Sequence, residues 1–189
     1  MKKVCLVLGL VLASCLATLA QSAEQKAEPK KTLSSVLDGT VKNVEGEFVS
    51  AAEAMPEDKY RFAPTSGEFK GVRNFGQQVK HVAAVNYIVG ATILGEKPPV
   101  DTGEENGPES VKTKAEILKF LKDSFAYAHK VVTSVTDANA LEPIKNPFGK
   151  ESTTRLSMAT VFAWHGFDHY GQIVEYLRMN GIIPPASRR

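Results

Sequence analysis

The sequence is poor in cysteine and in net charge, and both shortages exclude classes of protein. It has 189 residues with two cysteines, and 23 lysines and arginines face 21 aspartates and glutamates. So few cysteines exclude a small fold held together by disulfides. A chain so close to neutral lacks the basic excess that holds nucleic acid, so we expect no nucleic-acid partner. A hydrophobic fraction of 43% at low net charge excludes a disordered chain, and the length suits one domain.

The first 23 residues have the features of a secretory signal peptide. Lys2 and Lys3 precede an uncharged apolar run over residues 4–19, and small and polar residues follow up to Ala23. The run has about 16 residues, short of the roughly 20 that span a bilayer, so we expect no transmembrane segment. Removal of residues 1–23 would also remove both cysteines and leave no net charge. A metal site in the mature chain must then use histidine, aspartate or glutamate.

The same segment also has a feature of lipoprotein signal peptides. The sequence Leu-Ala-Ser-Cys at residues 12–15 resembles the lipobox of bacterial lipoproteins, in which the cysteine is lipidated. The apolar run continues beyond Cys15, and this favours cleavage further along, near Ala23. We therefore expect an exported protein of the bacterial periplasm or cell envelope, with a lipid anchor at Cys15 as the alternative.

The rest of the chain has the periodicity of helices. Residues 24–31 are charged and lack that periodicity, so we expect a flexible tether. Apolar residues at steps of three, four and seven predict four helices: from Thr32 or Ser34 to Met55, about 74–94, about 112–137, and from Ser152 or Thr153 to Asn180. Four amphipathic helices of about 20–28 residues predict an all-α, antiparallel-type four-helix bundle over residues 32–185. Prolines and glycines predict a long loop over residues 95–110.

Two of the four histidines form an H-x-x-x-H pattern in the last predicted helix. His165 and His169 lie about 40° apart around the helix and one turn along it, so both imidazoles project from one face. They lie in the middle of an apolar stripe, where two neutral imidazoles are costly without partners. One shared metal ion would satisfy both, and a separate hydrogen bond for each is the alternative. The glutamate of the metalloprotease pattern H-E-x-x-H is absent, because Gly166 follows the first histidine.

The other candidate residues are less specific. By periodicity, His81 lies on the flank of the second predicted helix. His129 lies about 90° from the stripe of the third, so we expect it near the surface and outside any metal site. Asp168 could orient an imidazole or be solvated. Gln172 shares the ligand face and could bind a water, a substrate or an adjacent helix. Gln172 and Asp168 are therefore the candidates for catalytic residues.

Three stretches of the sequence, in order, resemble the DinB-like family of four-helix bundle proteins. They are residues 54–64 (AMPEDKYRFAP), 73–83 (RNFGQQVKHVA) and 165–173 (HGFDHYGQI). The resemblance extends over residues 32–185. In this family one histidine of the second helix and two of the last hold a divalent metal, which implies the ligands His81, His165 and His169. The family often has a histidine or arginine directly after the last ligand, where this chain has Tyr170, so no role is carried over to that position.

The resemblance implies a metal-dependent function of one of two classes. Relatives include thiol-dependent transferases and isomerases, and others are described as metal-dependent hydrolases. We therefore expect either an enzyme of hydrolase or thiol-transferase type acting on a small molecule, or a non-catalytic metal- or ligand-binding bundle of the cell envelope. Zinc and nickel are the first choices of metal, with iron and manganese as alternatives, because all accept imidazole. A homodimer is compatible with the sequence as an oligomeric state.

Overall fold

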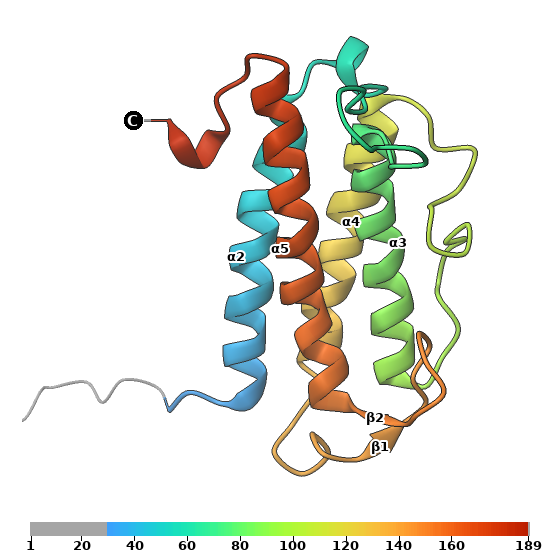
Figure 1. Cartoon of the computed structure of the whole chain (residues 1–189). Coiled ribbons are helices and arrows are strands. Elements are labelled where there is room, and N and C mark those ends of the chain that lie inside the picture. Colours follow the sequence, from blue (N-terminus) through green and yellow to red (C-terminus); the bar gives the residue numbers. More distant parts are fainter. Residues whose placement is uncertain (1–29, 189) are drawn as a thin grey trace, which may run out of the picture. The chain divides into compact units, whose positions relative to one another are not determined.

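The computed structural model describes residues 30–188, so the predicted signal peptide and most of the predicted tether lie outside the described residues. Four long helices confirm the predicted all-α four-helix bundle (Figure 1). They are α2 (Leu33–Ala54), α3 (Phe75–Leu94), α4 (Lys114–Val132) and α5 (Arg155–Met179). Within residues 30–188 the remaining elements are two short 3₁₀ helices, η1 (Glu57–Lys59) and η2 (Pro185–Ser187), and one pair of two-residue strands, β1 (Pro143–Ile144) and β2 (Thr153–Thr154). None of the helices described combines the length and apolarity that a membrane crossing needs.

Polar side chains set where the helices begin. The side chains that cap the helix N-termini are Thr32, Asn74, Thr113 and Thr154. At the first three, the side chain three residues further on hydrogen-bonds back to the capping residue, which is the reciprocal capping box. The cap of the last helix, Thr154, lies one or two residues later than the expected Thr153 or Ser152. The reason is that Thr153 and Thr154 first pair with Ile144 and Pro143 as an antiparallel ladder.

The third helix is shorter than predicted. It ends at Val132, although the apolar periodicity continues to Val135. The hydroxyl groups of Thr133 and Ser134 hydrogen-bond to the carbonyl groups of Lys130 and Val131 at 2.6 and 2.7 Å, and such bonds compete with helix continuation. Val135 is nevertheless fully buried, so the apolar pattern correctly indicates the core but not the end of the helix.

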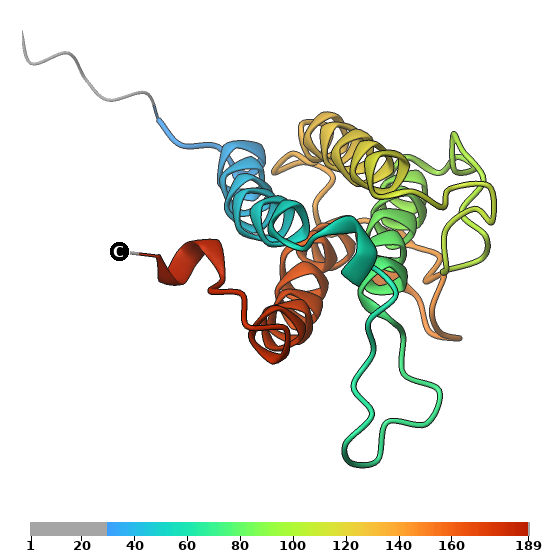
Figure 2. The same ribbon diagram turned by 90° about the horizontal axis from the view of Figure 1, so that it is seen from above.

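The four helices form a ring in the order α2–α4–α3–α5, as the view from above shows (Figure 2). The pairs α2–α4 and α3–α5 are antiparallel, whereas α3–α4 and α2–α5 run in the same direction (Figure 1). The antiparallel arrangement that we expected therefore holds for two of the four neighbouring pairs. Because α3 and α4 are parallel, the segment between them must return along the length of the bundle (Figure 1).

That returning segment, residues 95–113, is held against α3. Lys80 on α3 donates from Nζ to the carbonyl groups of Pro108 and Val111 at 2.7 and 3.2 Å. Gly107 lies directly over Lys80 with φ of +75°, and a Cβ atom there would come within 2.9 Å of Lys80 Cε. Glycine is therefore required where the segment approaches the helix most closely. These contacts place the segment beside the N-terminal half of α3.

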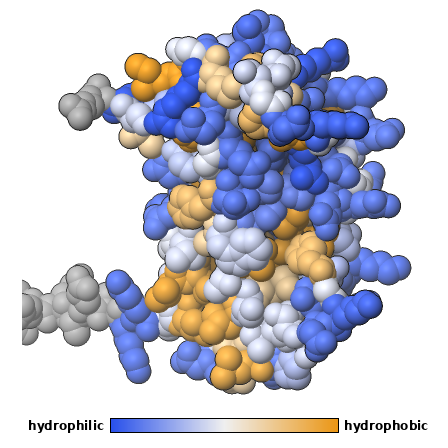
Figure 3. All heavy atoms as spheres, viewed as in Figure 1, coloured by the Kyte–Doolittle hydropathy of each residue, from blue (hydrophilic) through white to orange (hydrophobic). Residues whose placement is uncertain are grey.

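Each long helix contributes one phenylalanine with no exposed surface or almost none to the core. These are Phe48, Phe75, Phe125 and Phe162. The helices α2 and α5 pack tightly at Gly166, where a Cβ atom would lie 2.5 Å from Val44 Cγ2. The face seen in Figure 3 is mostly hydrophilic in its upper half and more apolar in its lower half, where α5 begins.

Candidate metal centre

Three histidines from two neighbouring helices converge inside the bundle. His81 comes from α3, and His165 and His169 come from α5. One ring nitrogen of each lies within 4.8 Å of those of the other two, and the Nε2 atoms of His81 and His165 are 3.1 Å apart. His81 and His169 are only 5% and 8% exposed. The structure thus brings together the three histidines that the family resemblance implied.

The outer ring nitrogens of two of these histidines are held by oxygen acceptors. His81 donates from Nδ1 to the carbonyl oxygen of Glu105 at 2.6 Å, and His169 donates from Nδ1 to Oε1 of Gln78 at 2.7 Å. An imidazole that donates from Nδ1 presents an unprotonated Nε2, which is the form that binds a metal. The two hydrogen bonds therefore prepare both rings as ligands.

A chain of hydrogen bonds continues behind His169. Gln78, from α3, is 2% exposed and donates from Nε2 to Oε1 of Gln172 at 2.8 Å. Gln172 donates in turn from Nε2 to Oδ2 of Asp168 at 3.1 Å. Of the partners considered for Gln172, the structure therefore provides the adjacent helix. Asp168 is exposed, and its hydrogen-bond connection to His169 runs through the two glutamines.

The environment keeps the three imidazoles neutral. Burial is the main cause that lowers the pKa of His165 to about 3, and the neighbouring His169, His81 and Arg73 lower it further. Burial likewise lowers the pKa of His169 to about 4, with a smaller lowering from His81 and an opposing effect of Asp168. The pKa of His81 is also lowered, chiefly by burial. All three rings are thus in the neutral form that metal binding requires near neutral pH.

The cluster fits a divalent ion. Nitrogen atoms that bind one tetrahedral zinc at about 2.0–2.1 Å lie roughly 3.3 Å apart, and the separation of the Nε2 atoms of His81 and His165 is close to that value. Without an ion, His165 can donate its Nε2 proton to His81. A bound ion would replace this single shared proton and engage the three lone pairs at once.

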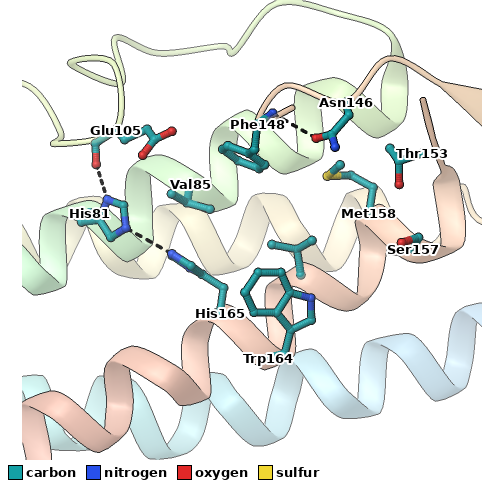
Figure 4. A pocket seen from close by; sticks show the side chains of 11 residues that line it. His81, Val85, Glu105, Asn146, Phe148, Thr153, Ser157, Met158, Trp164 and His165 are labelled. Atoms are coloured by element: carbon teal, nitrogen blue, oxygen red, sulfur yellow. Dashed lines mark hydrogen bonds between the residues drawn. The ribbon is translucent and has the colours of Figure 1, made fainter. Parts of the chain in front are cut away.

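A cavity of about 350 Å³ opens beside two of the three histidines (Figure 4). His81 and His165 line one end of it, and the carboxylate-bearing residue Glu105 lies at the same end. The segments that close the cavity are α3, α5, the returning segment and the connection that carries β1 and β2. A molecule in this cavity would therefore reach the histidine cluster directly.

The fourth histidine lies apart from this cluster. His129, on α4, contacts two carboxylates of α2: its Nδ1 is 2.6 Å from Asp38 Oδ1, and its Nε2 is 3.1 Å from Glu45 Oε2. Its side chain is partly exposed, as its position off the apolar stripe predicts. His129 thus connects two helices rather than joining the other histidines.

Gln78 and Glu105 were missed by the sequence reasoning, for different reasons. Gln78 precedes His81 by three residues, so helical spacing places both on one face of α3 and could have indicated it. Glu105 reaches His81 only through the path of the returning segment, which no local pattern in the sequence describes.

Comparison with known proteins assigns the family. The family model of the DinB superfamily matches residues 41–173, which include the three histidines and Gln78. The chain belongs to the DinB superfamily. This confirms the family that the three sequence stretches indicated.

Among solved structures, this DinB-superfamily protein is similar to YfiT from Bacillus subtilis, described as a probable metal-dependent hydrolase with an unusual four-helix bundle topology. The TM-score is 0.61 at 19% sequence identity, over 84% of this chain and 94% of YfiT. At such an identity the likeness shows a shared fold. No curated protein sequence matches this chain.

Proposed function

We propose that this DinB-superfamily protein is a metal-dependent enzyme of hydrolase or thiol-transferase type that acts on a small molecule. His81, His165 and His169 would hold one divalent ion, zinc or nickel in the first place and iron or manganese as alternatives. The observation that carries the proposal is the convergence of three neutral imidazoles at the end of an accessible cavity. The description of YfiT as a probable metal-dependent hydrolase supports the same class.

The chain's own residues would orient the ligands. An ion held by three neutral imidazoles supplies a Lewis acid with an open coordination position. The carbonyl group of Glu105 orients His81, and Gln78 orients His169. Gln172 and Asp168, the candidates from the sequence, would assist through Gln78 as positioning residues, because their hydrogen bonds lead to His169 by that route.

Glu105 is also suited to proton transfer. It is the one carboxylate among the residues that line the cavity, and its side chain lies at the histidine end (Figure 4). A carboxylate placed there can accept a proton at Oε1 or Oε2 and return it to a leaving group. It would supply the base that the H-x-x-x-H pattern itself lacks, and this favours an enzyme over a non-catalytic binding bundle.

Metal analysis and turnover on a panel of esters and thiol acceptors test the proposal together. Wild type and His129→Ala should each hold about one metal ion per chain and turn over the same substrate. His165→Ala should lose both properties. Glu105→Gln keeps the backbone carbonyl that holds His81, so it should retain the metal and lose turnover. Metal without turnover of any panel substrate in wild type would instead select the non-catalytic metal-binding bundle.

We also propose export to the periplasm or cell envelope, with a lipid anchor at Cys15 as the alternative. The basic start, the apolar run of residues 4–19 and the small residues before Glu24 support it. N-terminal analysis of the protein from its native host should find residues 1–23, or nearly all of them, removed. A lipidated Cys15 would select the anchored form, and an intact Met1 would refute export.

A further inference from the structure

We propose that the cavity beside the histidines selects a small molecule whose body, beyond the group that meets the metal, is uncharged and largely apolar and carries a neutral polar group at its far end. The inference rests on the proposed function, because the histidine end would receive the reacting group. It adds the class of substrate, which the family and the shared fold leave open.

The walls of the cavity are apolar. Val85 on α3 and Met158 and Val161 on α5 are almost completely buried and face it. Two aromatic side chains, Phe148 and Trp164, border it while remaining 44% and 58% exposed, and Figure 4 shows them between the two ends. Exposed aromatic surface of this size is unfavourable in water. A ligand with an apolar body would cover it and gain affinity from that burial.

The charges around the cavity oppose an ionic ligand. No lysine or arginine is among its lining residues, and the titratable groups there are His81, His165 and Glu105. Cations nearby line other cavities: Arg73 lines one together with Gln78, and Lys145 and Arg155 line another. A charged group placed away from the histidine end would therefore lose its hydration between apolar walls without gaining a partner of opposite charge among the lining residues, which is costly.

Neutral polar side chains mark the end opposite the histidines. Asn146, Thr153 and Ser157 line that end (Figure 4). Asn146 Oδ1 accepts from the N–H of Phe148 at 3.0 Å, which leaves its NH₂ group to donate to a ligand. An amide and two hydroxyl groups suit a hydroxyl, ether or carbonyl group rather than a charged one.

A series of alkanohydroxamates tests the preference, because the hydroxamate group binds divalent metals and the tail can be varied. Trp164 is the only tryptophan of the chain, so its fluorescence reports occupancy directly. On the zinc-loaded protein, binding should tighten about fourfold for each methylene from aceto- to hexanohydroxamate. At equal length, a terminal carboxylate or ammonium group should weaken binding at least tenfold against a terminal methyl group, and a terminal hydroxyl group should not.

A matched pair of variants locates the tail. Ser157→Phe adds a ring at the far end of the cavity and should abolish the gain from the longer tails. Thr160→Phe adds the same ring three residues along α5 at an exposed position outside the cavity lining, and it should keep the gain. Unchanged helicity and melting of both variants would show that they fold.

The outcomes separate this inference from the proposed function. Acetohydroxamate binding that is lost in His165→Ala would support the metal centre. If longer tails then gave no gain in affinity, or if the tail with a terminal carboxylate bound best, the inference would be overturned and the metal centre would stay in place. If no hydroxamate binds, the metal function fails, and neutral amides with the same tails test the cavity alone. If these amides quench Trp164 fluorescence more strongly as the tail lengthens, and if Ser157→Phe removes the effect, the inference is supported. If the amides do not quench Trp164 in this way, the inference is overturned.

Discussion

Gln78 is buried between α3 and α5, and both ends of its amide group are used. Its Oε1 atom accepts from His169, and its Nε2 atom donates to Gln172. Groups that hold the outer nitrogen of a metal-binding histidine typically contribute 10- to 100-fold in metal affinity. We expect Gln78→Leu to weaken zinc binding by about that factor, measured by competition with a chromophoric chelator.

The isosteric variant distinguishes this positioning role from simple packing. Gln78→Glu retains an oxygen acceptor for His169 Nδ1, so zinc affinity should stay at or above that of wild type. Equal losses in Gln78→Leu and Gln78→Glu would show that an oxygen acceptor for His169 Nδ1 is not what supports zinc binding. Unchanged affinity in Gln78→Leu would show that the hydrogen bond to His169 does not support the site.

His129 gives the stability a pH dependence of known sign. Burial lowers its pKa, but the hydrogen bonds and charges of Asp38 and Glu45 outweigh burial and raise the pKa above its ordinary value. A group whose pKa is raised by folding stabilises fully below its unfolded pKa, about 6.5, and this contribution is lost as the pH rises through the folded pKa. The destabilisation caused by His129→Ala should therefore be larger at pH 6 than at pH 9, in urea unfolding with metal present.

Lys130→Ala is the control for that experiment. Lys130 is exposed and adjacent to His129, so its removal should have a similar effect at both values of pH. A destabilisation by His129→Ala that is equal at both values, or larger at pH 9, would contradict the role assigned to the two carboxylates.

At the scale of elements, two helix glycines have opposite roles. Gly46 on α2 is exposed, and no atom lies within 4 Å of a Cβ placed there. Gly46→Ala should therefore raise the free energy of unfolding by up to about 1 kcal/mol. Gly166 faces Val44, so Gly166→Ala must push α2 and α5 apart and should cost about 1–3 kcal/mol.

The double variant Val44→Ala/Gly166→Ala tests the steric cause. Removing the Val44 methyl groups makes room for the new Cβ atom, so the double variant should lose less stability than the two single losses added together. Urea unfolding of the four proteins measures this coupling. Strict additivity would mean that the contact between Val44 and Gly166 does not limit how closely α2 and α5 pack.

The helices and the H-x-x-x-H pair could be predicted from the sequence because both depend on local spacing. The first, second and fourth helices end within one or two residues of the expected positions. His81 was assigned by resemblance only. Periodicity places it off the main stripe of α3, but α3 is buried on almost every side, by α4, α5 and the returning segment. For such a helix the apolar stripe does not indicate which residues face the site.

The non-local parts of the site could not be predicted in this way. The contact between Glu105 and His81 depends on the path of residues 95–113, and the cavity depends on where the connection after α4 carries Asn146 and Phe148. The first follows from the parallel direction of α3 and α4, and the second from the ring order, in which α4 and α5 are not neighbours among the described residues. Both are properties of the whole bundle and leave no periodic signal.

At the scale of the whole molecule, the proposed metal should stabilise the fold without creating it. An ion that binds only the folded chain contributes about 4 kcal/mol at a thousandfold excess over its Kd. Chelation should therefore lower the Tm by several degrees, measured by circular dichroism, while the far-ultraviolet spectrum stays helical because the apolar stripes still pack. An unchanged Tm after proven removal of the metal would show that these histidines do not hold it, and loss of all helicity would make the ion structural.

The ring order α2–α4–α3–α5 also determines how the chain acquires its fold. Each helix packs extensively only against the two helices of the other half of the chain, since α2–α3 and α4–α5 are not neighbouring pairs among the described residues. A fragment that ends within residues 95–113 would thus hold two helices without a common interface, and so would its complement. Neither half can form a partial core before the other is present, so folding should be all-or-none. The first fragment would carry His81 and the second His165 and His169, so the histidine cluster would form only when the two fragments bind each other.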